Sequence, residues 1–285
     1  MTQTPALATP PTPVPPQIRF SVLYIAALGF ALWALGWFVL IPSHESQLGW
    51  ILEFVGPLLI AVAIIMCVQS LAARIGKLAV FLAAAAAVSG ALSTVFFAID
   101  PAALETIDGV RFGYGAYGVA LLLGSFSLAV VLVRKEAHMT AAPAHTYPLC
   151  PVGCPCGVVT HASFGAIALG AAGLLVWGIG FLALCTEPEG TRFGWSLAVV
   201  GSLAVTSGLA AHFAHLSARF GRWAIISGVA SAIIWSLGYL LEAIDPAAGP
   251  LSSWYTDLFI CYGVGHLLTA LSLLLVARRK RFLES

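Results

Sequence analysis

Five ionisable side chains interrupt long apolar stretches of this chain, where a charged or strongly polar group is costly and usually serves a function. Three of them are histidines: His212, His215 and His266. Two are glutamates, Glu53 and Glu242. Imidazole nitrogens bind haem iron or metal ions and relay protons, whereas carboxylates bind protons and cations. The sequence therefore indicates buried polar chemistry inside an apolar protein.

The histidines allow a cofactor site, which we weigh against simple hydrogen bonding. His212 and His215 are three residues apart, which predicts one shared face of a helix. At the helical rise of about 1.5 Å per residue, His266 is expected about 8 Å deeper than His212. A shared metal or haem site then requires strongly tilted helices, while a hydrogen bond to a neighbouring helix requires none. Both interpretations stay open, as does a proton relay.

The two glutamates are each predicted about one turn inside the outer membrane boundary. Their long side chains could extend to water from there. The alternative is a substrate or proton path, in which Glu242 and His266 line one outward cavity, with Glu53 as a further candidate. We prefer this path as a hypothesis for a substrate site.

A cluster of thiols forms a second candidate site. Cys150, Cys154 and Cys156 lie within seven residues, flanked by His145 and His161. Thiolates and imidazoles fit zinc or copper(I), and haem is a less favoured cofactor here because the spacing differs from a haem-attachment motif. A redox-sensing thiol and a proline-stiffened linker without any ion are the alternatives.

An acidic pair recurs in two copies of the sequence Ile-Asp-Pro-Ala-Ala. The carboxylates of Asp100 and Asp245 could bind a cation from outside the membrane. The simpler interpretation is structural, since Asp favours the cap of a helical turn and Pro its first position.

The composition decides which elements position these residues. Of 285 residues, 60% are hydrophobic and 9% charged, against about 25% charged in ordinary soluble domains. This excludes a soluble globular protein, and a net charge of +1 argues against nucleic-acid binding. A membrane helix needs about 20 apolar residues. Eight stretches qualify, at about 20–42, 50–72, 77–98, 114–134, 162–185, 194–216, 222–243 and 256–277.

The basic residues predict the orientation. Eleven of the 13 Lys and Arg residues fall in the two tails and the even-numbered loops, with only Arg111 and Arg192 elsewhere. Since basic residues gather on the cytoplasmic side, both termini should lie in the cytoplasm of a cell-membrane protein. Aromatic residues near span ends, among them Trp50, Trp195, Trp223 and Tyr114, are assigned to an interfacial belt.

The chain also repeats itself. Shifted by 145 residues, 47–103 overlays 192–248 with 20 identities in 57 positions, among them Gly49-Trp50 with Gly194-Trp195. The shift continues to Tyr117, which meets Tyr262. Four helices per repeat return the chain to its starting side, so the two halves should be parallel and related by a pseudo-twofold axis along the membrane normal.

The predicted fold is thus all-α, with eight transmembrane helices in two four-helix repeats. The domains are a proline-rich disordered tail (1–19), the first repeat (20–134), a Cys/His/Pro linker (135–161), the second repeat (162–278) and a basic tail (279–285). No nucleotide-binding loop, Ser-His-Asp arrangement or His-Glu-x-x-His motif marks an enzyme. The function we favour is a carrier or permease for a small solute or ion. The alternatives are a metal- or haem-binding redox or metal-handling protein and a non-catalytic subunit of a membrane complex. The partners expected besides the lipid bilayer are subunits of such a complex or further copies of this chain.

Overall fold

The computed structural model describes residues 20–43, 45–141, 163–186, 192–245 and 253–284, and these segments are helical. The elements of the first half are α1 (Phe20–Leu40), α2 (Gln47–Met66), α3 (Val68–Ile75), α4 (Lys77–Leu92), α5 (Val95–Ile99), the 3₁₀ turn η1 (Pro101–Glu105) and α6 (Ile107–Ala141). Those of the second half are α7 (Ser163–Thr186), α8 (Arg192–Ala211), α9 (Phe213–Phe220), α10 (Arg222–Ile244) and α11 (Ser253–Glu284).

Seven helices in the described segments are long and apolar enough to cross a membrane: α1, α2, α6, α7, α8, α10 and α11. Large apolar side chains also cover the outside of the molecule, as at Phe81 and Val133, which are 68% and 66% exposed. Such a surface is stable against lipid and unfavourable in water. The chain is therefore a multi-pass helical membrane protein.

The third expected stretch, 77–98, does not form one continuous helix. It divides into α4, of 16 residues, and the short α5. At the break, the hydroxyl of Ser93 donates to the Gly90 carbonyl at 2.6 Å, and that of Thr94 donates to the Ala91 carbonyl at 3.1 Å. Hydroxyls that bond the backbone in this way compete with the helical pattern. The corresponding helix α10 continues without interruption over 23 residues.

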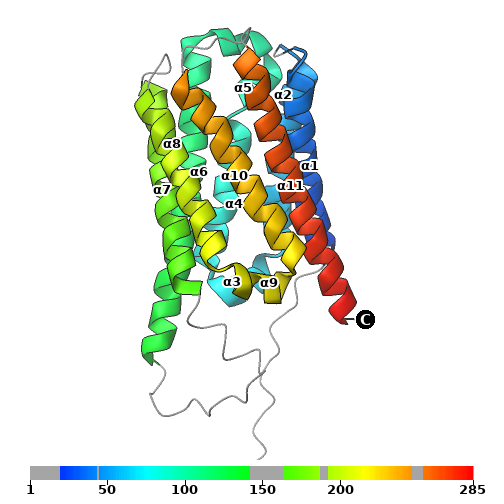
Figure 1. Cartoon of the computed structure of the whole chain (residues 1–285), viewed down its shortest axis with the longest axis vertical. Helices are drawn as coiled ribbons and strands as arrows, with labels where there is room; N and C mark the ends of the chain where they lie inside the picture. The colour runs from blue at the N-terminus through cyan, green and yellow to red at the C-terminus, as the bar shows by residue number, and fades with distance from the viewer. Residues whose placement is uncertain (1–19, 44, 142–162, 187–191, 246–252, 285) are drawn as a thin grey trace, which may run out of the picture.

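The second and sixth expected stretches end earlier than predicted. Cys67 separates α2 from α3, and His212 separates α8 from α9. The short helices α3 and α9 pack on α4 and α10, at the same end of the molecule (Figure 1). The prediction that His212 and His215 share one face of the sixth membrane helix is thus wrong. Both short helices are amphipathic, and a turn at the break lets an apolar side pack on the bundle.

The seven long helices and the shorter α4 form a closed ring. In order around it, each packs against the next: α1, α2, α4, α6, α7, α8, α10 and α11, and α11 packs back against α1. The start of α1 and the end of α11 lie at the end that carries α3 and α9 (Figure 1). Every long helix therefore has one side toward the centre of the ring, where a site can form.

Small residues bring α1 close to α2, and α7 close to α8. A Cβ on Gly56 would lie 2.7 Å from the Gly29 carbonyl oxygen, and one on Gly201 would lie 2.6 Å from that of Gly173. Likewise Leu40 packs on Gly49 and Leu184 on Gly194. The contacts between α1 and α2 thus recur between α7 and α8, at positions 144 residues apart for α1 and α7 and 145 residues apart for α2 and α8. Close approach of this kind holds helices together in lipid.

Candidate functional site

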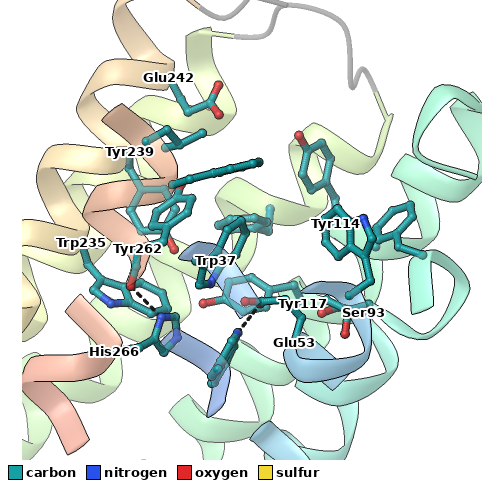
Figure 2. Close-up of a pocket in the computed structure, with 18 of the residues that line it drawn as sticks. Trp37, Glu53, Ser93, Tyr114, Tyr117, Trp235, Tyr239, Glu242, Tyr262 and His266 are labelled. Carbon is teal, nitrogen blue, oxygen red and sulfur yellow. Dashed lines mark hydrogen bonds between the residues drawn. The ribbon is translucent and has the colours of Figure 1, made fainter. Parts of the chain in front are cut away.

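The centre of the ring contains a cavity of about 340 Å³ (Figure 2). Its lining comes from both halves of the chain: from seven helices of the ring, from α5 and from the break between α4 and α5, whereas α4 itself contributes none of the lining residues. The lining residues are Trp33, Trp37, Trp50, Glu53, Ser93, Thr94, Phe97, Val110, Gly113, Tyr114, Tyr117, Phe181, Trp195, Trp235, Tyr239, Glu242, Leu258, Phe259, Tyr262 and His266.

Glu53 lies at the deep end of this cavity and is fully buried. Its Oε2 accepts a short hydrogen bond from the indole N–H of Trp33, drawn as a dashed line in Figure 2. Its Oε1 has no hydrogen-bond partner and lies against the α1 backbone, 2.8 Å from where a Cβ of Gly36 would be. Glycine at 36 thus makes room for a carboxyl group between α1 and α2. The side chain does not extend to water.

His266 is the second fully buried polar group at this end. Its ring lies between Trp33 and Trp235, with ring centroids 4.1 Å and 4.4 Å away. Nδ1 is 2.8 Å from the Tyr262 carbonyl oxygen, which can only accept, so Nδ1 carries the proton. In the neutral ring Nε2 is then an acceptor, and it has no partner among the described residues.

Glu242 lies at the opposite end of the cavity, near the last turn of α10 (Figure 2). It is partly exposed, whereas Glu53 and His266 are fully buried. Tyr239 and Tyr262 lie between Glu242 and His266 in this view. The cavity therefore runs from a carboxyl group near the end of the bundle to a second carboxyl and an imidazole deep inside it.

Aromatic rings form most of the wall between these ends. Twelve of the twenty lining residues are Phe, Trp or Tyr, and five of the eight tryptophans of the chain are among them. Several come in pairs 145 residues apart in the sequence, such as Trp50 with Trp195 and Tyr117 with Tyr262. The rings also pack on one another, as Trp37 does on Tyr262 at 5.0 Å. The wall is hence a mutually packed aromatic layer.

The structure brings together the three residues of the predicted substrate or proton path. Glu242, His266 and Glu53 all line the one cavity (Figure 2). The role assigned to them stays a prediction. The sequence signal that located them was the replacement of apolar counterparts, Phe97, Leu121 and Ala198, in the other repeat.

The other predicted residues lie elsewhere. Asp100 caps η1, accepting the Ala102 N–H at 3.1 Å, and Asp245 follows the end of α10. His212 precedes α9, with its Nδ1 3.2 Å from the Gly208 carbonyl oxygen, and His215 lies in α9. Asp100, Asp245 and His212 are not among the residues that line the cavity.

The predicted cysteine site, with Cys150, Cys154 and Cys156 between His145 and His161, falls outside the described residues. Within the described segments, no three His, Cys, Asp or Glu side chains are close enough together to hold a metal ion. The cofactor hypotheses for both the thiols and the histidines stay predictions.

Sequence reasoning missed the aromatic wall. Trp50, Trp195 and Tyr114 were assigned to an interfacial belt, but they line the cavity, and both tryptophans are only 5% exposed. Trp223, at 70% exposed, is the one of the four on the outer surface. The pairing of Trp50 with Trp195 was the available signal, because a lipid-facing belt does not require the same ring at the same repeat position.

Fold and site together define a multi-pass membrane protein with a central, aromatic-lined cavity. Comparison with protein-family models gives no match, and neither do comparisons with curated proteins and with solved structures. The function is therefore argued from the cavity alone.

Proposed function

We propose that the chain is a membrane carrier that binds a small solute in the central cavity. The observation that carries the proposal is the position of this cavity, inside a closed ring of helices and lined by ionisable groups at two depths. Ligand cavities of this kind are concave, mostly apolar and furnished with a few polar groups that orient the ligand. A protein with only a structural role has no need of such a chamber.

The carrier consists of eight crossings in two parallel four-helix repeats. The matched contacts Leu40–Gly49 and Leu184–Gly194 support this arrangement, as do the two equivalent junctions of the ring, α6 with α7 and α11 with α1. The eighth crossing is made by α4 together with α5. Binding at the interface of two repeats is common in transporters, where one repeat moves against the other.

Within the cavity, Glu242 is the first group that a solute meets, and Glu53 and His266 bind it at the deep end. The orientation predicted from the basic residues puts Glu242 toward the outside of the cell membrane and both termini in the cytoplasm. This path uses all three residues for substrate or proton binding.

Accessibility from the two membrane faces tests carriage. In a chain with its six native cysteines replaced, Thr94→Cys places a thiol in the cavity. A membrane-impermeant maleimide is applied to right-side-out and to inside-out vesicles. A carrier exposes this thiol to both faces in turn, whereas a fixed receptor or subunit exposes it to one face only. Ser43→Cys, before α2 on the exposed surface, reports the sidedness of each preparation.

Solute uptake into vesicles is the second test of carriage. Vesicles with the reconstituted protein are offered radiolabelled amines, amino acids and sugars in turn. Carriage predicts saturable uptake of at least one of them, lost in Glu242→Gln. Labelling from one face only, with no uptake above protein-free vesicles, overturns the proposal.

A metal-handling function is the second candidate, favoured by the thiol cluster at Cys150, Cys154 and Cys156. Zinc or copper(I) is the expected ion, since both bind thiolates. Metal analysis of the protein purified without chelator tests it. One ion per chain, lost when the three cysteines become serine, supports it, and a metal-free folded protein contradicts it.

A further inference from the structure

We propose that the central cavity selects an organic ammonium monocation with an apolar body. This inference names the solute class and rests on the proposed function only in using the same cavity. Three observations support it: the ionisable lining groups include two carboxyl groups and no Lys or Arg, aromatic side chains lie between them, and acceptors at the deep end lack hydrogen-bond partners.

The lining of the cavity has acidic residues but no Lys or Arg. Glu53 and Glu242 are carboxyl groups, and no Lys or Arg occurs among the twenty lining residues. The basic residues nearest in sequence, Arg111 and Arg192, are exposed and outside the lining. A cation entering an apolar membrane protein gains from such groups, whereas an anion finds no positive partner.

The aromatic wall favours the same class. The face of an indole or phenol ring attracts a cation, and Trp does so most strongly. Trp33 and Trp235 pack on His266 at the deep end, with ring centroids 4.1 Å and 4.4 Å away, and Trp37 is a further tryptophan of the lining. Because an ammonium group carrying carbon substituents is weakly hydrated, rings can replace its water, and its apolar body packs on the remaining wall. A metal ion, by contrast, needs several oxygen or nitrogen ligands together.

The unpartnered acceptors complete the set. Three atoms of lining residues are buried without hydrogen-bond partners: the acceptors Oε1 of Glu53 and Nε2 of His266, and the indole N–H donor of Trp37. Buried polar atoms are normally paired in a folded protein, and exceptions often mark ligand sites. The two acceptors attract positive charge when Glu53 is ionised and the His266 ring is neutral, and in that state neither offers a donor to an anion.

Binding by the purified full-length protein in a nonionic detergent tests the inference. The probe is benzyltrimethylammonium, followed by intrinsic fluorescence because five of eight tryptophans line the cavity. Its neutral isostere neopentylbenzene and the anion benzenesulfonate are titrated in parallel. We expect saturable quenching by the cation, affinity at least about tenfold weaker for the isostere, and no saturable effect of the anion.

Matched variants locate the site. Glu242→Gln removes one charge without changing shape and should weaken cation affinity about tenfold. Asp257→Asn removes an exposed acid near the start of α11, outside the cavity, and should leave it unchanged. Trp37→Phe keeps an aromatic ring and should cause a smaller loss than Trp37→Leu, while Trp223→Leu, on the outer surface, serves as the control.

Equal affinity for the cation and the isostere overturns the inference, and so does unchanged cation affinity in Glu242→Gln. The outcomes remain separable from those for carriage. Cation binding without uptake or two-sided labelling leaves the ligand class standing and refutes the carrier. Saturable uptake of a sugar without cation binding supports the carrier and refutes the ammonium ligand class.

Discussion

At the scale of single residues, the hydrogen bond from Trp33 to Glu53 is the least expected contact of the site. Glu53→Ala copies the residue of the other repeat, Ala198, and leaves the indole N–H without its acceptor. We expect it to lower the free energy of unfolding by about 1–3 kcal/mol, the cost of a buried unpaired polar group. Glu53→Gln keeps an acceptor at the same place and should lose much less. Unfolding in detergent, followed by tryptophan fluorescence, measures both.

The exposed Glu45 supplies the control for this prediction, because Glu45→Ala removes an acidic side chain that lies on the surface. Equal stability of the Glu53→Ala, Glu53→Gln and Glu45→Ala variants contradicts the importance of the bond.

A second prediction at this scale concerns Gly36, which makes room for Glu53. A Cβ at this position would lie 2.8 Å from Glu53 Oε1 and 2.9 Å from the Gly49 carbonyl oxygen. Gly36→Ala should destabilise by about 1–3 kcal/mol, as overpacking does. Gly165→Ala, whose added Cβ meets nothing within 4 Å, should be neutral or slightly stabilising. Thermal unfolding of the two variants side by side decides, and equal midpoints contradict the tight packing.

The sequence predicted some of the residues that line the site. Comparing the two repeats singled out Glu53, Glu242 and His266, because a polar residue facing an apolar counterpart is informative inside a membrane. The hydrogen bond to Trp33 was not readable, since it joins α1 to α2 through the relative rotation of two helices. No pattern along either helix encodes that rotation.

At the scale of the elements, the sharp turns after α3 and α9 depend on two glycines with positive φ, Gly76 at 97° and Gly221 at 101°. With ψ of 147° and 139°, both glycines lie in an extended region at positive φ that side chains rarely adopt, and forcing one there costs about 1–3 kcal/mol. Gly76→Ala and Gly221→Ala should each destabilise by that amount. Gly90→Ala in the interior of α4, where the nearest atom to a Cβ is 4.0 Å away, should not.

Chemical unfolding of the three single variants measures the difference. Loss of stability in Gly90→Ala alone contradicts the prediction. Arg279 next to Gly221 is a further partner of this turn, donating from Nη2 to the Ala218 carbonyl at 2.8 Å, and its place at the end of α11 ties the turn to the ring.

Element boundaries were the weakest part of the sequence prediction. Hydropathy alone continued the second and sixth stretches past Cys67 and His212, because α3 and α9 still carry apolar residues. Their polar residues allow these segments to turn across the end of the bundle. The break at Ser93 and Thr94 depends on hydroxyls that donate to the backbone. Whether a hydroxyl makes such a bond depends on how its surroundings pack, which the sequence does not show.

At the scale of the whole molecule, the composition excluded a soluble globular protein, because 60% of the residues are hydrophobic and only 9% are charged. The long apolar stretches then predicted membrane helices. The repeat predicted which helices correspond, but the closed ring and its cavity depend on how far the helices stay apart. Paired large rings such as Trp50 and Trp195 are buried in the lining of that cavity.

The number of crossings is the remaining prediction at this scale. If α4 and α5 together cross the membrane, the turn at Gly76 and the η1 segment lie on opposite faces, although α4 alone has only 16 residues. Single cysteines in a cysteine-free chain test this, at Lys77 and at Thr106, both exposed or at the surface of their turns. An impermeant maleimide should label Lys77→Cys only in inside-out vesicles and Thr106→Cys only in right-side-out vesicles. Labelling of both from the same face means that this segment does not cross, which would leave seven crossings and put the ends of α1 and α11 on opposite sides. Since Figure 1 places both ends on one side of the ring, we expect eight.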